Sequence, residues 1–193
     1  MSYNAFAEFY DGLTGNVEYK DRAEYIEKLI KSFGREAGTT LDLACGTGSL
    51  TLELYRRGFD IFGVDASIDM LSEAQQKCSE DEQILFICQK MQRLNLASEI
   101  DTCICTLDSI NHLTNPKDVK ETFKRVAKYL SKDGLFIFDV NTLYKHREVL
   151  CDNCFVFDTD EVFCSWQNEL DKETDIVTVS YTHLRAHETS QDL

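Results

Sequence analysis

The chain has 193 residues, of which 43% are hydrophobic and 28% charged, and its formal net charge at pH 7 is −14. This length suits one globular domain that buries its own core. The acidic balance argues against binding to the phosphate backbone of nucleic acids, and no apolar run reaches the ~20 residues that a membrane-spanning helix needs. Because the first residues form neither a basic segment nor an apolar signal core, we expect a cytoplasmic protein with no nucleic-acid or membrane partner.

Residues 3–33 are predicted to be helical, in two stretches separated by Gly15. Apolar residues recur at helical spacing in both stretches, and Gly34 and Gly38 end the second. The first stretch has one apolar face, formed by Phe6, Phe9, Tyr10 and Leu13. We expect residues 1–38 to lie across the ends of the strands as a lid, unless their aromatic side chains simply belong to the core.

A glycine turn follows the first predicted strand, residues 41–44. Gly46 and Gly48 have no side chain where the backbone must turn and where a ligand can touch it. The next helix is predicted at about residues 50–57, and its first amides face whatever lies above the strand end. The second strand, residues 61–64, is followed by Asp65, whose carboxylate can accept two hydrogen bonds from a ribose diol. This order predicts a nucleoside-binding unit of the doubly wound type; the alternative is a helix-packing turn beside an ordinary surface acid.

The middle of the chain continues the alternation of strands and helices. Ser67 is a predicted N-cap, and Asn115 and Pro116 begin a long helix that ends near Ser131. Strands are expected at 84–88, 102–107 and 135–140, with a turn at 132–134 before the last of them. The inward side chains expected on the long helix are Val119, Phe123, Val126, Ala127 and Leu130. Five strands alternating with helices predict a parallel sheet with right-handed crossovers.

The pattern changes after about Leu150. Short strands are predicted at 155–157, 162–166 and 176–181, joined by turns at 158–161 and 171–175. We interpret this part as an antiparallel β appendage of the sheet domain.

Eight cysteines are present, mostly in or beside predicted core elements. There they behave as small hydrophobic residues, and we expect them to be reduced. Only Cys151 and Cys154 have the spacing of metal ligands, with Cys164 and His146 as the nearest additional candidates. One such pair is a weak signal, so we expect no metal site.

Three groups of residues resemble the class I S-adenosylmethionine-dependent methyltransferases, particularly small bacterial-type members. They are the segment 41–48, the segment 64–67 with Met70 and Leu71, and the segments 106–113 and 130–139. The resemblance covers about residues 1–182. It implies an α/β, Rossmann-like, doubly wound and mainly parallel sheet, with the cofactor over the carboxyl ends of strands 1, 2 and 4. Relatives continue into a helix and two further strands, so the resemblance also implies that the final strands are missing here.

The resemblance assigns a cofactor role to several positions. Gly46 and Gly48 would pass beneath the methionine and ribose parts, and Asp65 would hold the ribose hydroxyls. Ala66 and Met70 would pack against adenine, and Leu107 would border the methionyl group. The full set implied to contact S-adenosylmethionine is Tyr10, Ala44, Gly46, Gly48, Asp65, Ala66, Met70, Lys90, Met91 and Leu107. Ala44 replaces a glycine, and Lys90 stands where relatives often have an acid near the adenine amino group.

Candidate catalytic residues follow the fourth strand. The resemblance implies that Asp108 and Asn111 face the transferable methyl group, although both residue types also favour capped turns. His112 is the best candidate for a general base, because it titrates near neutrality; a purely structural histidine is the alternative. Asp139 is a weaker candidate for the base. Tyr10 and Tyr19 are expected to close over the cofactor.

The expected organisation is a methyltransferase domain at 1–150, the appendage at 151–182 and a non-native tail at 183–193. The tail expectation rests on residues 180–190, which have no counterpart in the family; an ordinary polar tail is the alternative. The acceptor is expected to be a small molecule of unidentified structure, and the oligomeric state stays open. Two other functions compete with methyl transfer: an inactive or binding-only remnant of the fold, and a nicotinamide-dependent oxidoreductase.

Overall fold

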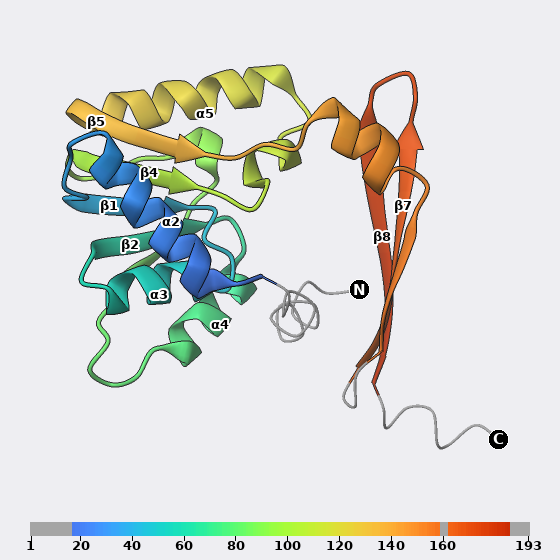
Figure 1. Cartoon of the computed structure of the whole chain (residues 1–193), viewed down its shortest axis with the longest axis horizontal. Coiled ribbons are helices and arrows are strands. Elements are labelled where there is room, and N and C mark those ends of the chain that lie inside the picture. Colours follow the sequence, from blue (N-terminus) through green and yellow to red (C-terminus); the bar gives the residue numbers. More distant parts are fainter. Residues whose placement is uncertain (1–16, 159–161, 186–193) are drawn as a thin grey trace. The chain divides into compact units, whose positions relative to one another are not determined.

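The computed structural model describes residues 17–158 and 162–185. The expected apolar face of the N-terminal stretch, with Tyr10, therefore lies outside the described residues. The chain divides into two compact units, Met1–Val140 and Asn141–Leu193, and each is described by itself (Figure 1). No helix in the described part combines the length and the apolar character needed to cross a membrane.

The first unit contains a five-stranded parallel sheet of order β3-β2-β1-β4-β5. Its strands are β1 (Thr39–Leu43), β2 (Asp60–Asp65), β3 (Phe86–Cys88), β4 (Ile100–Cys105) and β5 (Leu130–Phe138). The strand order reverses between β1 and β4, which pair directly. The prediction of a doubly wound α/β fold, with the fourth strand beside the first, is confirmed. In such sheets ligands bind at the carboxyl ends of the strands beside this reversal.

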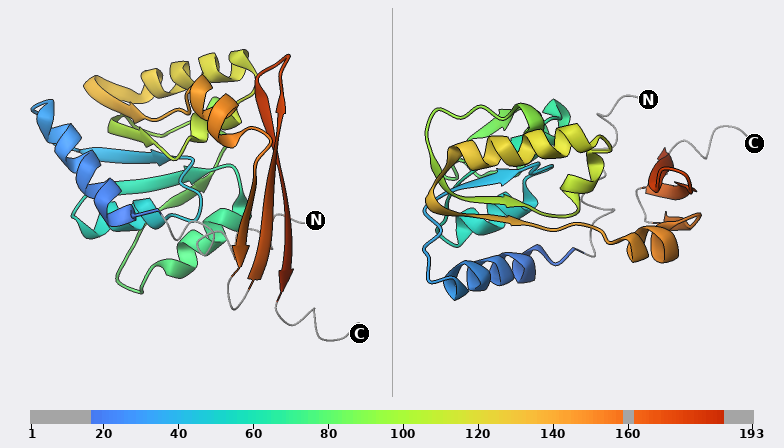
Figure 2. Two further views of the ribbon diagram at one scale, coloured as in Figure 1. Left: turned by 45° about the vertical axis from the view of Figure 1, so that its right-hand side comes forward. Right: turned by 90° about the horizontal axis from the view of Figure 1, so that it is seen from above.

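Helices cover both faces of this sheet (Figure 2, right). On one face, α2 (Tyr19–Ser32) and α3 (Ser49–Arg56) bury a cluster that includes Ile26, Leu54 and Ile104. On the other, α5 (Pro116–Tyr129) packs Val126 and Tyr129 onto strands β1 and β4. The remaining short elements of the unit are α4 (Ile68–Lys77), η1 (Met91–Arg93) and η2 (Ser109–His112). Because each face is covered, the polar ends of the strands are left as the place where a ligand can enter.

Both predicted helix caps are confirmed. The Ser67 hydroxyl accepts a hydrogen bond from the Met70 amide at 3.3 Å, and the Asn115 side chain accepts one from the Lys117 amide at 3.0 Å. These bonds fix where α4 and α5 begin, since each satisfies one of the amides that a helix start leaves unpaired. The start of α4 matters for the site because it follows Asp65 directly.

Three local predictions are wrong. The fourth strand ends at Cys105 rather than 107, because Leu107 and Asp108 have positive φ angles that cannot continue a strand. The fifth strand begins at Leu130 rather than at 135, and the expected turn at 132–134 is an irregularity within it, where pairing jumps from Ile100–Leu130 to Thr102–Leu135 and Asp133 has φ +68°. Ala127 is exposed rather than inward, because α5 buries Thr122, Val126 and Tyr129 instead.

The second unit contains a three-stranded antiparallel sheet, as predicted. Its elements are η3 (Lys145–Leu150), β6 (Cys154–Asp158), β7 (Val162–Asp171) and β8 (Ile176–Arg185). Strand β7 is central, and Trp166 pairs with Phe155 on one side and Tyr181 on the other. Strand β8 includes residues 183–185 of the segment expected to be a tail, whereas the rest of that segment lies outside the described residues.

Candidate functional site

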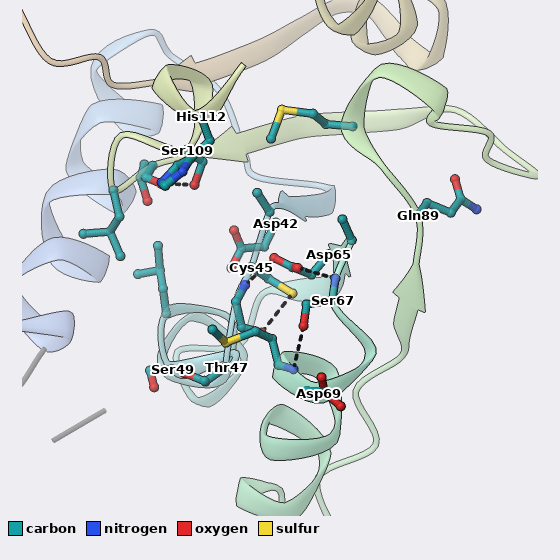
Figure 3. A pocket seen from close by; sticks show the side chains of 18 of the residues that line it. Asp42, Cys45, Thr47, Ser49, Asp65, Ser67, Asp69, Gln89, Ser109 and His112 are labelled. Carbon is teal, nitrogen blue, oxygen red and sulfur yellow. Dashed lines mark hydrogen bonds between the residues drawn. The ribbon is translucent and has the colours of Figure 1, made fainter. Parts of the chain in front are cut away.

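A cavity of about 730 Å³ opens at the carboxyl ends of β1, β2 and β4 in the first unit. Its wall is built mainly from the loops that follow these strands and from the loop that follows β3 (Figure 3). The predicted site residues that line it are Ala44, Gly46, Asp65, Ala66, Met70, Lys90, Met91, Leu107 and His112. Residues from four segments of the sequence are thus brought to one hollow at the reversal of strand order.

Among the predicted residues that the structure describes, Gly48, Asp108 and Asn111 do not line this cavity. A Cβ atom on Gly48 would lie 2.8 Å from the Ala74 Cβ, so Gly48 lets α3 start close against α4. Asp108 and Asn111 are half-buried in the loop after β4, where the Asn111 amide donates to the Asp108 carbonyl at 2.8 Å. Tyr10 lies outside the described residues. Asp108 and Asn111 therefore take part in the turn of this loop, in which Ser109 is the residue between them that lines the cavity.

The turn after β1 has left-handed backbone at every second residue from 44 to 48. Ala44, Gly46 and Gly48 have φ angles of +61°, +56° and +71°. An alanine tolerates this conformation at a cost of about 1–2 kcal/mol, and the Ala44 amide is held by the Val64 carbonyl at 2.7 Å. A Cβ atom on Gly46 would meet nothing within 4 Å. Gly46 therefore leaves bare backbone facing the cavity, whereas Gly48 permits close packing.

Asp65 binds the glycine turn to the start of α4. One oxygen of its carboxylate accepts a hydrogen bond from the Gly46 amide at 2.9 Å, and the other accepts one from the Ser67 amide at 2.8 Å. A carboxylate can accept about four hydrogen bonds, so capacity remains for a ligand. The side chain lies at the centre of the cavity wall (Figure 3).

Asp42 is a wall residue to which the sequence analysis assigned no role. It lies on β1, is 3% exposed, and accepts a hydrogen bond from the Thr51 hydroxyl at 2.6 Å. Burial raises the pKa of Asp42 from 3.8 to about 6, with the negative charge of Asp65 adding to the effect and the Thr51 bond opposing it. An acid in the middle of an apolar strand that leads into a glycine turn is the signal that would have identified it.

The wall carries a net acidic character. Among the described wall residues the carboxylates are Asp42, Asp65 and Asp69, and the lysine is Lys90. Such a surface attracts cations. Cys45 also lines the cavity, but burial raises the pKa of its thiol well above the usual range. The thiol is therefore protonated at neutral pH, where it acts as a packing group rather than as a nucleophile.

The loop after β4 forms the opposite wall. Leu107 and Asp108 have φ angles of +60° and +51°, and both amides donate to the Asp139 carboxylate at the end of β5, at 3.0 and 2.6 Å. The Arg22 guanidinium lies 3.3 Å from the same carboxylate. His112 follows on η2 as an exposed wall residue. Tyr19, at the start of α2, is also on the wall.

A doubly wound sheet with a bare glycine turn and a strand-end acid beside its reversal defines a nucleoside-binding α/β protein. Comparison with known proteins makes the class specific. The family model described as "Methyltransferase domain" matches residues 40–134. The chain is 37% identical over 169 residues to the "Putative methyltransferase YqeM" of Bacillus subtilis (strain 168). The aligned region covers 87% of this chain and 67% of that protein.

A solved S-adenosylmethionine-dependent methyltransferase from Clostridium acetobutylicum ATCC 824 superposes with a TM-score of 0.77 at 35% identity, over 95% of this chain and 81% of that one. A glycine/sarcosine N-methyltransferase from Aphanothece halophytica is 30% identical over 69% of this chain, which spans about half of that protein (51%). The chain belongs to the class I S-adenosylmethionine-dependent methyltransferases.

Proposed function

We propose that this chain binds S-adenosylmethionine in the cavity between β1, β2 and β4 and transfers its methyl group to a small molecule. The observation that carries the proposal is that the bare Gly46 backbone and the Asp65 carboxylate lie side by side on the wall of one cavity. The proposal covers the first unit, in which all the named wall residues lie.

The wall residues fit this cofactor in size and in charge. A volume of about 730 Å³ lies within the range of ~300–1,000 Å³ typical of small-molecule sites. The ribose hydroxyls can donate to the unused acceptor positions of Asp65. The cofactor is cationic at its sulfonium and amino groups, which suits a wall with Asp42, Asp65 and Asp69. The apolar part of the wall, with Ala66, Met70 and Met91, suits a stacked adenine ring.

Bound S-adenosylmethionine supplies an activated methyl group on a good leaving group. The work left to the chain is alignment and exclusion of water. Leu107 and Ser109 form the part of the cavity wall that follows β4, and Tyr19 of α2 forms another part. Asp42, ionised at pH 7 because its pKa is about 6, attracts a cationic group on the ligand.

An acceptor that arrives protonated needs a base. His112 is the proposed base, because it is exposed on the cavity wall within the loop after β4. Asp108 and Asn111 lie in the same loop and are proposed to shape it. The small-molecule class of the acceptor is supported by relatives named for glycine and sarcosine methylation.

Titration with S-adenosylhomocysteine tests the proposal. We expect the wild type to bind and the Asp65→Ala variant to lose ~1.5–3 kcal/mol of binding free energy, the magnitude typical of charged hydrogen bonds. NADH serves as the control ligand and should not bind. Calorimetry that detects binding of NADH alone would favour the oxidoreductase, and binding of neither ligand would favour the inactive or binding-only remnant.

A further inference from the structure

The geometry points to Asp139 as the positioning residue for the methyl-donor side of the cavity, acting with Arg22 rather than as a base. This inference rests on the proposed function. The carboxylate of Asp139 joins three segments: the end of β5, the loop after β4 and the first turn of α2.

The loop after β4 needs an external support. Leu107 and Asp108 are consecutive non-glycine residues in left-handed backbone, a conformation that is strained for any residue with a Cβ atom. Such strain persists only where surrounding bonds over-determine it. The two charge-assisted bonds from these amides to Asp139, at 3.0 and 2.6 Å, are the strong type that can hold it.

The Asp139 carboxylate also forms an ion pair with a residue of α2. Arg22 lies 3.3 Å from Asp139 and stands one turn after Tyr19, a residue of the cavity wall. On the other side, the supported loop carries Leu107, Ser109 and His112, which also line the cavity. Two walls of one site are therefore tied to a single side chain that does not line the cavity itself.

This arrangement makes Asp139 a poor base. Both of its oxygens accept backbone amides, and one also faces a guanidinium. Because the two amides and the guanidinium already occupy the carboxylate, it serves as an acceptor for the loop and for Arg22. Asp139 instead fixes the position of the loop after β4, and this position determines how well the amino-acid part of the cofactor fits. The ribose end of the cofactor depends on Asp65.

Two ligands separate this role from general stability. In the proposed binding mode the amino-acid part of S-adenosylhomocysteine lies against the loop after β4, and 5′-methylthioadenosine lacks this part. We expect Asp139→Ala to weaken S-adenosylhomocysteine about 10- to 30-fold, because the loop loses the two charge-assisted bonds that hold it in its binding conformation. Its affinity for 5′-methylthioadenosine should change by less than about twofold on the same reasoning. Asp139→Asn retains one acceptor oxygen and should give an intermediate loss.

Asp133→Asn is the matched control. Asp133 lies on the same strand and pairs with Arg35 at 3.7 Å, but neither residue lines the site cavity. Asparagine also tolerates the positive φ at this position. The control should leave both affinities unchanged, so a loss in Asp133→Asn equal to that in Asp139→Ala would overturn the inference.

The outcomes also separate this inference from the function on which it rests. If Asp65→Ala leaves both affinities unchanged, the proposed function fails. If Asp65→Ala weakens both ligands while Asp139→Ala weakens them equally or not at all, only the positioning role fails. Should Asp139→Ala not fold, amide hydrogen exchange of Leu107 and Asp108 in Asp139→Asn decides: faster exchange than in the wild type supports the role, and unchanged exchange refutes it.

Discussion

Replacing the buried acid Asp42 by asparagine should stabilise the ligand-free protein near pH 8. Burial raises the pKa of Asp42 from 3.8 to about 6, and a difference of this size between the folded and the unfolded state corresponds to about 3 kcal/mol. A raised carboxyl pKa stabilises the fold below the unfolded pKa, and this contribution is lost as pH rises through the folded value. At pH 8 the ionised Asp42 thus lowers the free energy of unfolding by about 3 kcal/mol. Solvent does not screen this charge appreciably, because Asp42 is only 3% exposed.

The assay is urea unfolding of wild type and Asp42→Asn at pH 8 and pH 4. Asparagine can still accept the Thr51 hydroxyl, so the variant should be more stable at pH 8 by about 1–3 kcal/mol after the burial of its amide is included. This advantage should shrink by about 2 kcal/mol at pH 4. Asp60→Asn is the control, because Asp60 accepts the Thr39 hydroxyl at the surface and should show no such pH dependence. A stability difference that does not change with pH would refute the reasoning.

Further variants test the glycine turn, the cap of α5 and the charge of the wall. Gly46→Ala introduces a side chain into open space at φ +56°, so it should cost about 1 kcal/mol of unfolding free energy while its Cβ lowers S-adenosylhomocysteine affinity in calorimetry. Gly48→Ala, which places a Cβ 2.8 Å from Ala74, should instead destabilise by at least ~2 kcal/mol in urea unfolding, through strain and overpacking. Asn115→Ala should lower the free energy of unfolding by ~1 kcal/mol without altering ligand affinity. Asp42→Asn should weaken S-adenosylhomocysteine about tenfold at pH 8, and an unchanged affinity would show that this acid does not face the ligand's cation.

The strand order could be predicted because the order of strands and helices along the sequence restricts how the strands can be arranged in the sheet. The alternation of strands and helices, with handed crossovers, leaves few topologies, and Ser67, Asn115 and Pro116 mark helix starts through their own side-chain chemistry. Gly46 and Asp65 could be placed at the strand ends for the same reason, because each follows a predicted strand directly, and both line the cavity. The contact of Asp65 with a ribose stays a prediction.

The missed features depend on long-range contacts. Ala127 lies at the right helical spacing, but α5 is rotated so that Thr122 and Tyr129 are buried instead. The left-handed backbone at Leu107 and Asp108 has no local glycine signal, because its support comes from Asp139, about 30 residues further along the sequence. Nothing within the loop itself could have indicated that contact.

The two amide bonds to Asp65 have a consequence for substitutions at the strand-end acid. Because its oxygens bridge Gly46 and Ser67, the length of the side chain is matched to a span between two fixed loops. A glutamate has the same charge, but its extra methylene moves the carboxylate out of that span, so the conservative exchange would leave one loop unsupported. A negative charge is therefore not sufficient at position 65. The length of the side chain, which differs by one methylene between aspartate and glutamate, determines whether both amides can be bound.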